Sequence, residues 1–259
     1  MPQAIKPREK APVSRGFRSQ PRDTNAMIKV ISRFGVIAVN SASNDNTLSS
    51  DETKRLQERI VVLDFETTGL SALGGDRAIE VGAVVLENGK ITDQYQSLIQ
   101  TDFRVDSFIE NYTGITNHML AQAPHPDQVF PELFRFIDDS IMVAHNAGFD
   151  RKFLDMELAQ LGYARQQPFL CSMRIARRLY QDAPNHKLGT LINHAKVPVT
   201  GTFHRALADA EMTALLWLEM MGLLRHRYKI SEISLHLLLQ LEKKTIKQTD
   251  RWLRETQGD

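Results

Sequence analysis

Two carboxylates stand one residue apart at the end of an apolar run, in the stretch IVVLDFETTGL at residues 60–70. Because a β-strand points alternate side chains to opposite faces, Asp64 and Glu66 should share one face while Phe65 points to the other. Two like charges about 4 Å apart near a protein surface repel each other by roughly 4 kcal/mol. The pair therefore predicts either a shared proton or a bound cation.

Two later stretches bring further acids and a histidine. VAHNAGFD (143–150) runs from a strand into a helix and places Asp150 in the first helical turn, where the helix dipole favours negative charge. HRALADA (204–210) places His204 just before a helix and Asp209 within its first turns. We therefore expect four carboxylates and one histidine, from three separate segments, to face one cleft.

These stretches resemble the three motifs of the DEDDh class of 3′–5′ exonucleases, the DnaQ-like family. The motifs are Asp-x-Glu in DFETTGL, Asn-x-x-Phe-Asp in NAGFD and His-x-Ala-x-x-Asp in HRALAD. The chain is similar to the epsilon proofreading subunit of bacterial DNA polymerase III and its stand-alone relatives from about Ile60 to Leu224, including YTGIT (112–116) and KLGTL (187–191). It departs from that subunit at Thr113, where a histidine is usual.

The resemblance implies that Asp64, Glu66, Asp150 and Asp209 hold two Mg²⁺ (or Mn²⁺) ions and belong, with His204, to the catalytic set. An all-oxygen site without thiols also suits these cations by its own chemistry. Two such ions ~3.5–4 Å apart can stabilise both the attacking and the leaving oxygen of a phosphodiester displacement. His204 fits the general base that takes a proton from the attacking water.

The resemblance further implies which residues bind substrate. They are Thr67, Thr68, Gly69, Leu70, Asn146 and Phe149. For the turn after the strand, an ordinary loop role is the alternative. The implied activity is release of nucleoside 5′-monophosphates from the 3′ end of single-stranded or frayed DNA, in proofreading or DNA repair. An RNA-trimming exoribonuclease of the same class and a catalytically idle docking module remain open as alternatives.

Hydrophobic patterning predicts the elements that must position these residues. Expected strands cover Ile60–Glu66, Ile79–Leu86, Ile91–Ile99 and Ile141–Ala144, and expected helices cover Asp127–Asp138, Phe149–Leu161, Ser172–Tyr180, Lys187–Ala195 and Ala206–Leu224. The Asn88-Gly89 pair predicts a hairpin, and Pro131 is tolerable only near the start of its helix. Strands followed by alternating strands and helices predict an α/β fold with a mixed sheet, which the resemblance identifies as ribonuclease H-like.

Composition sets the remaining expectations. The 259 residues carry a net charge of +1, so attraction to nucleic acid must come from local patches. The single cysteine, Cys171, excludes an internal disulfide and fits a reducing compartment, which favours a cytoplasmic protein. No apolar run approaches the ~18–20 residues of a membrane span, so no span is expected. We expect a basic tail and linker (1–55), an exonuclease domain (56–224) and an amphipathic helical extension (225–259). Nucleic acid is the expected partner, and a DNA polymerase or other replication or repair protein is possible.

Overall fold

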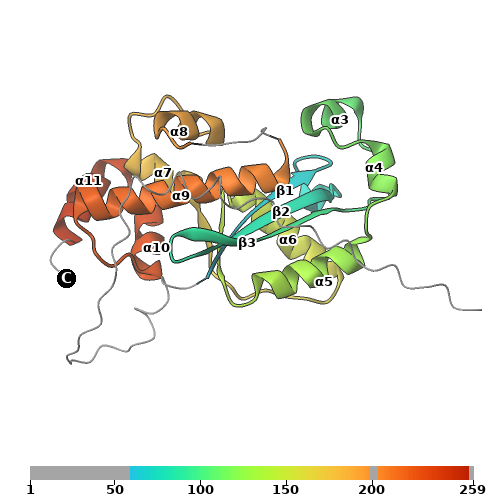
Figure 1. The fold of residues 1–259 in the computed structure, drawn as a ribbon, viewed down its shortest axis with the longest axis horizontal. Helices are drawn as coiled ribbons and strands as arrows, with labels where there is room; N and C mark the ends of the chain where they lie inside the picture. Colours follow the sequence, from blue (N-terminus) through green and yellow to red (C-terminus); the bar gives the residue numbers. More distant parts are fainter. Residues whose placement is uncertain (1–58, 199–203, 257–259) are drawn as a thin grey trace, which may run out of the picture. The chain divides into compact units, whose positions relative to one another are not determined.

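A five-stranded mixed sheet forms the centre of the residues that the computed structural model describes, 59–198 and 204–256 (Figure 1). In the spatial order β3-β2-β1-β4-β5, the strands are β3 (Lys90–Leu98), β2 (Ala78–Glu87), β1 (Ile60–Thr67), β4 (Ile141–Ala144) and β5 (Phe169–Cys171). The three strands β1, β2 and β3 are antiparallel neighbours, whereas β1, β4 and β5 run parallel. The predicted mixed sheet is confirmed. The tail predicted for residues 1–55 lies outside the described residues.

Helices cover both faces of this sheet. They are α3 (Ser107–Thr113), α4 (Asn117–Ala121), α5 (Pro126–Ile137), α6 (Gly148–Gln160), α7 (Ser172–Leu179), α8 (Leu188–His194), α9 (Ala206–Tyr228), α10 (Leu235–Lys243) and α11 (Ile246–Glu255), with a short 3₁₀ turn η3 (Ala72–Gly74) after β1. The helices α5 and α6 pack on one face, and α7 to α11 contribute to the core on the other (Figure 1).

Side-chain alternation along β1 divides the core between these two layers. Val61, Leu63 and Phe65 are buried against α5 and α6, whereas Ile60 and Val62 are buried in the layer that contains α9. The period of two is what a strand buried on both faces requires. It also determines that the next even-numbered side chains of β1 emerge on the α9 face.

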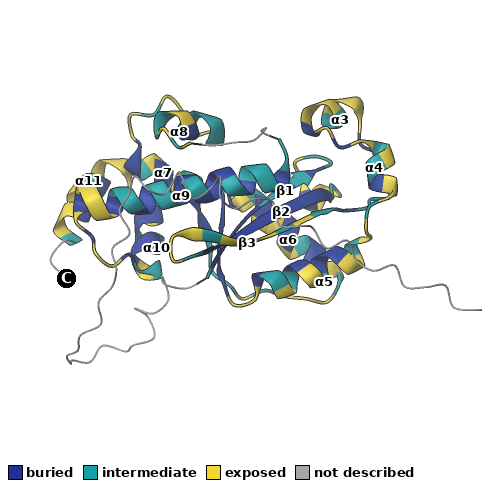
Figure 2. Cartoon of the chain, viewed as in Figure 1, coloured by how far each residue is buried: buried dark blue, intermediate teal, exposed yellow. Residues whose placement is uncertain are grey.

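The hairpin between β2 and β3 forms at the predicted Asn-Gly pair. Asn88 and Gly89 have φ values of 51° and 74°, the two consecutive positive angles of a type I′ turn. β3 is an edge strand whose side chains are all exposed or partly exposed, in contrast to the buried β1 and β2 (Figure 2). Polar residues along such an edge discourage pairing with another chain.

Hydrophobic periodicity does not predict three short elements, β5, α3 and α4. Each is too short to show a helical or strand period, although Asp106 and Thr116 cap α3 and α4 by accepting backbone N–H bonds. α9 continues one turn beyond the predicted end, to Tyr228. The expectation for Pro131 was too strict, because it lies in the second turn of α5 rather than at its start. It costs that helix one backbone hydrogen bond.

The segment after α9 packs back onto the helices of the domain. Leu253 of α11 is fully buried in the α9 layer. The Arg178 guanidinium of α7 donates to the Lys244 carbonyl oxygen at 2.7 and 3.0 Å, and the Tyr228 hydroxyl donates to Asp250 at 3.0 Å. A domain division near residue 225 stays a prediction. None of the helices described is both long enough and apolar enough to span a bilayer.

Candidate active site

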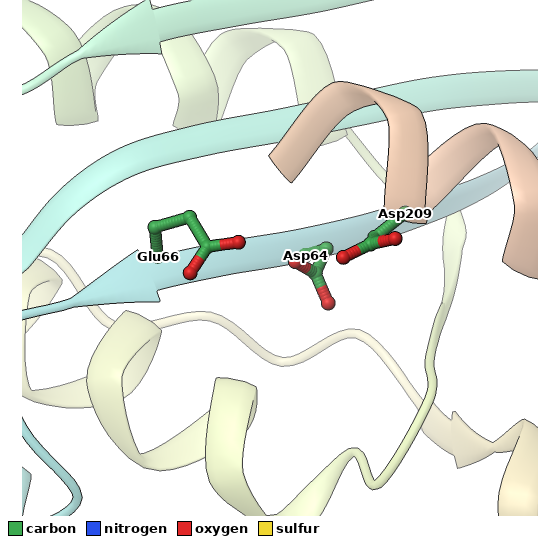
Figure 3. Close-up of side chains that lie close together, drawn as sticks. All are labelled: Asp64, Glu66 and Asp209. Atoms are coloured by element: carbon green, nitrogen blue, oxygen red, sulfur yellow. The ribbon is translucent and has the colours of Figure 1, made fainter. Parts of the chain in front are cut away.

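Asp64 and Glu66 emerge from β1 on the same face and meet Asp209 from the first turns of α9 (Figure 3). Each of these three residues offers one carboxylate oxygen, and the three oxygens lie within 4.8 Å of one another. Figure 3 shows the carboxylates of Asp64 and Asp209 turned toward each other, with Glu66 reaching in from farther along the strand. We refer to Asp64, Glu66 and Asp209 as the carboxylate cluster.

The close approach of α9 to the sheet depends on Gly82 of β2. A Cβ atom at this position would lie 2.1 Å from the backbone nitrogen of Leu207 and 2.2 Å from the carbonyl carbon of Ala206. Gly82 is the register partner of Asp64. The missing side chain therefore lets the start of α9 rest on the sheet beside Asp64, which brings Asp209 into the cluster.

A buried ion pair fastens the same end of α9 to β2. Glu80, which is fully buried, accepts hydrogen bonds from the Arg205 guanidinium, the shortest at 2.6 Å, and from the backbone N–H of Ala206 at 3.1 Å. The Gln96 side chain of β3 donates a further bond at 2.8 Å. Because these donors satisfy the Glu80 carboxylate, it can remain buried and hold the entrance to α9 in one position.

Asp150 reaches the carboxylate cluster from α6 without being part of it. Its Oδ1 accepts the backbone N–H of Phe65 at 3.2 Å, and its side chain is buried. Phe65 is the residue between Asp64 and Glu66, so this bond ties the first turn of α6 to β1 at the cluster. The structure thus places all four predicted carboxylates together, three within one group and the fourth directly beside it.

Burial raises the pKa of every one of these acids, and repulsion by the neighbouring carboxylates adds to the shift at Asp64 and Glu66. Burial raises the pKa of Glu66 to about 8, with Asp209 as the next cause, and that of Asp150 to about 7. Burial, then the charge of Asp150, raises the pKa of Asp64 well above its usual range. Burial also raises the pKa of Asp209, although the N–H of His204 opposes the shift. Without a cation, the folded chain therefore favours protons on this site.

The donor set fits a divalent metal ion. Oδ1 of Asp209 is buried and accepts no hydrogen bond from the described residues, which is unusual for a carboxylate oxygen. The neighbouring donors are hard carboxylate oxygens, the kind that Mg²⁺ and Mn²⁺ prefer. A cation between these oxygens would remove the repulsion and provide the missing partner, so the cluster is an acidic metal-binding site.

His204 lies at the entrance to α9, next to Asp209. Its φ of 70° is in the left-handed region, and its backbone N–H donates to Oδ2 of Asp209 at 3.2 Å. Its ring lies against the ring of Tyr112 from α3, with centroids 4.1 Å apart. Tyr112 is half-exposed and also stacks on Phe108. The predicted histidine therefore sits between the cluster and an exposed aromatic pair.

The turn after β1 is held by Asp76. The Asp76 carboxylate accepts the hydroxyl of Thr68 at 3.3 Å and the N–H of Ser71 at 2.8 Å, and it fills the space that a side chain at Gly69 would need. The Thr67 hydroxyl donates to the carbonyl of Gly69 at 2.6 Å. Leu70 remains 87% exposed. The two hydroxyls thus maintain the turn, and Leu70 is the side chain that the turn presents.

Asn146 and Phe149 differ in how far their side chains are exposed. Asn146 is exposed, with a φ of 69°, at the turn that joins β4 to α6. Phe149 is partly buried and packs on Phe153, with ring centroids 4.9 Å apart, in the core layer of α5 and α6. Of the two, only Asn146 presents its side chain openly, and a substrate role for either stays a proposal.

The sequence patterns do not single out three residues of this region: Tyr112, Glu80 and Arg205. Tyr112 lies in the YTGIT stretch, but its neighbour Thr113 is buried and bonds back to the Ile109 carbonyl at 2.8 Å. Thr113, which stands where the related proofreading subunit usually has a histidine, thus contributes to the internal packing of α3. Arg205 directly follows His204, and its charge among apolar residues could have indicated an ion-pair partner. No sequence spacing identifies that partner as Glu80, because the two residues are 125 positions apart.

The raised pKa values predict that the metal-free protein loses stability as pH rises. Glu66 would bind its proton up to about pH 8 when folded but only up to about 4.5 when unfolded. Between these values the folded state holds more protons, so the free energy of unfolding falls as pH increases. We expect a lower melting temperature in EDTA at pH 8.5 than at pH 6, and a smaller pH difference in Glu66→Gln. A pH effect of equal size in that variant would contradict the assignment.

Residues 61–217 match the family model described as RNase_T exonuclease. The chain is 36% identical over 174 residues to the PolC-type DNA polymerase III of Caldanaerobacter subterraneus subsp. tengcongensis, covering 67% of this chain and 12% of that protein. It is 36% identical over 172 residues to the 3′–5′ exonuclease DinG of Bacillus subtilis, covering 65% of this chain and 18% of that protein. The chain thus spans less than a fifth of the length of either relative.

Among solved structures, the chain is similar to exonuclease X in complex with 5′ overhanging duplex DNA. The two are 24% identical, and the superposition has a TM-score of 0.57 and covers 71% of this chain and 99% of that chain. This likeness confirms the predicted ribonuclease H-like exonuclease fold, with its mixed sheet and flanking helices.

Proposed function

The chain belongs to the RNase T/DnaQ-like family of DEDDh 3′–5′ exonucleases, and we propose that it releases nucleoside 5′-monophosphates from the 3′ end of single-stranded or frayed DNA. The carboxylate cluster, with the buried unpartnered oxygen of Asp209 and with His204 beside it, is the observation that carries this proposal. The likeness to a DNA polymerase, PolC, and to exonuclease X in its complex with DNA supports DNA as the substrate.

In this proposal, Asp64, Glu66, Asp150 and Asp209 hold two Mg²⁺ (or Mn²⁺) ions, which when bound would stabilise the attacking and leaving oxygens of the displacement. Asp150 also fixes the first turn of α6 against β1 through its bond with Phe65. A ring nitrogen of His204 takes the proton from the attacking water. The Glu80–Arg205 pair holds His204 and Asp209 in register by anchoring the start of α9.

The reacting nucleotide would lie between the cluster and the exposed apolar side chains around it. Leu70 follows the strand that carries Asp64 and Glu66, and the Tyr112 ring contacts the ring of His204. A base can stack on an aromatic ring regardless of the identity of the base. Contacts to the phosphate likewise read no sequence. We therefore propose an enzyme that requires an unpaired 3′ end but no particular sequence, together with Thr67, Thr68, Gly69, Asn146 and Phe149 as residues lining its substrate path.

The biological setting follows by analogy. PolC is named as a DNA polymerase, and the region similar to this chain is a small part of it. We propose that this chain acts in proofreading or repair during DNA replication, with a polymerase or another replication protein as its protein partner and the cytoplasm as its compartment.

The test uses the full chain and oligonucleotides labelled at the 5′ end. DNA and RNA, single-stranded and duplex, would each be incubated with Mg²⁺, with Mn²⁺ and with EDTA. We expect a metal-dependent ladder that shortens from the 3′ end of single-stranded DNA. His204→Ala should slow the reaction by ~10²- to 10⁴-fold, the contribution of a general base, whereas His118→Ala, an exposed histidine of α4, should not. A faster ladder on RNA would identify an exoribonuclease, and no ladder on any substrate would overturn the proposal.

A separate prediction concerns Tyr112. Tyr112→Ala should lower kcat/KM on single-stranded DNA by ~10-fold, because stacking of one base on an aromatic ring contributes about 1–3 kcal/mol. Tyr112→Phe should retain activity, since the ring remains. Phe103→Ala, which removes another exposed aromatic side chain outside the cluster, is the control. Equal activity of Tyr112→Ala and the wild-type protein would exclude Tyr112 from the substrate path.

A further inference from the structure

A cavity lies beyond the carboxylate cluster, at the ends of β4 and β5. Its volume is about 460 Å³, and its walls come from the start of α6, the end of β5, α7 and α10. Four arginines line it: Arg151, Arg174, Arg177 and Arg178. Glu242 is the carboxylate among the lining residues. We call this the arginine cavity.

Two of the four arginines bind the C-terminal helices. Arg178 donates to the Lys244 carbonyl at 2.7 and 3.0 Å. Arg174 donates to the Glu242 carbonyl at 3.2 Å and lies 3.7 Å from its carboxylate, which also accepts the N–H of Cys171. These contacts explain Arg174 and Arg178 as part of the packing of α7 on α10.

The other two arginines have no such role. Arg151 and Arg177 are exposed, and no carboxylate of the described residues lies within ion-pair distance of either. The Arg177 guanidinium contacts the sulfur of Met173 at 3.8 Å. Positive charge is crowded here, since burial and then the charge of Arg174 lower the pKa of Arg178. The cavity therefore has an excess of guanidinium groups over acids, which suits an anionic ligand.

The fold places the arginine cavity in line with the carboxylate cluster. β1, β4 and β5 are parallel, so their carboxyl ends lie at the same edge of the sheet. The end of β1 carries the cluster and the end of β5 borders the cavity, two strand spacings or about 10 Å away. Asp150 and Arg151 are consecutive in α6, one bonded to β1 at the cluster and the next lining the cavity.

We propose that the arginine cavity binds the phosphodiester backbone of the substrate strand a few nucleotides from the reacting 3′ end. This inference rests on the proposed function and adds a subsite to it. About 10 Å corresponds to roughly three nucleotides at the ~3.4 Å rise of a stacked strand. Guanidinium groups match phosphate through paired hydrogen bonds. Continuity with the cluster along one sheet edge favours the nucleic-acid strand over an acidic protein segment.

The test removes the two unpartnered charges in the full chain, as the double variant Arg151→Gln/Arg177→Gln. Two substrates would be compared: a single-stranded DNA of 12 nucleotides, and the p-nitrophenyl ester of thymidine 5′-monophosphate, which is too short to reach the cavity. We expect KM for the 12-mer to rise by ~10-fold and kcat/KM for the ester to stay unchanged. The slope of log affinity against log salt, which is negative, should become shallower by about 1.4, or ~0.7 for each lost phosphate contact. Lys152→Gln removes one positive charge from the adjacent exposed position of α6, which does not line the cavity, and should leave the KM for the 12-mer unaffected.

Binding of a fluorescent 12-mer in EDTA, measured by anisotropy, separates this inference from the proposed function. Weaker binding by the double variant supports the cavity even if the wild-type protein hydrolyses neither substrate, in which case only the proposed function fails. Unchanged binding and KM, or equal losses in Lys152→Gln, would overturn the cavity as a strand subsite and leave an acidic protein segment as its ligand.

Discussion

Changing Asp64 to asparagine is expected to reduce hydrolysis at the 3′ end by ~10³-fold or more while the protein stays folded. Asparagine has nearly the same shape but carries no charge, so it removes an anionic donor from the cluster. The loss corresponds to about 4 kcal/mol of transition-state stabilisation, in the range that a catalytic metal ion supplies. Asp209→Asn should behave in the same way, since its carboxylate lies in the same cluster.

The same two variants should be at least as stable as the wild-type protein in EDTA at pH 8. Each removes one charge from a partly buried group of acids whose pKa values are all raised, so the folded state loses repulsion. The measurements are the cleavage rate with Mg²⁺ and the melting temperature in EDTA. Asp93→Asn, on the exposed edge strand β3, is the control and should change neither. Wild-type activity in either cluster variant would refute the metal-site assignment.

Gly82→Ala is expected to be the most damaging single-methyl change near the site. The added Cβ would lie within 2.1–2.3 Å of the backbone of Ala206 and Leu207, so the start of α9 must move away from the sheet. Overpacking of this kind typically costs about 1–3 kcal/mol of stability. Because His204 and Asp209 flank the displaced backbone, a shift of about 1 Å should also lower the rate by ~10²-fold.

Gly222→Ala provides the matched control on the same helix. A Cβ at Gly222 meets nothing within 4 Å, so alanine should leave activity intact and raise the stability of α9 by about 0.5–1 kcal/mol. Unfolding in urea and the cleavage rate would be measured for both variants. Wild-type rate and stability in Gly82→Ala would show that contact between α9 and β2 does not position the site.

Local pattern was sufficient to predict most of the fold. The alternation from Ile60 to Glu66, the Asn-Gly turn and the apolar spacing of α5 are each signals that a single segment can reveal. The three motifs likewise predicted that Asp64, Glu66, Asp209 and His204 converge, and the structure brings them together. Short elements such as β5 and α4 were not predictable, since three to five residues cannot show a period and their formation depends on the neighbours they join.

What pattern could not reveal is the set of contacts that hold the site in place. In the sequence, Glu80 is a single acid within an apolar strand. Only the structure shows that Arg205, 125 positions later, neutralises it. In the sequence, Gly82 is a residue that disfavours a strand. Only the structure shows that the backbone of α9 packs against it. Arg151 and Arg177 share a cavity only because β4 and β5 end at the same edge of the sheet. Each depends on tertiary proximity between distant segments.

The left-handed backbone conformation of His204 affects any attempt to make this protein more thermostable. A residue with a Cβ at a φ of 70° lowers the free energy of unfolding by about 1 kcal/mol relative to glycine. A screen for thermal tolerance alone would therefore favour glycine at this position and discard the imidazole. At position 204, the residue that favours stability differs from the residue that the proposed catalysis requires. A protein that retains the histidine is therefore slightly less stable than it would be with glycine.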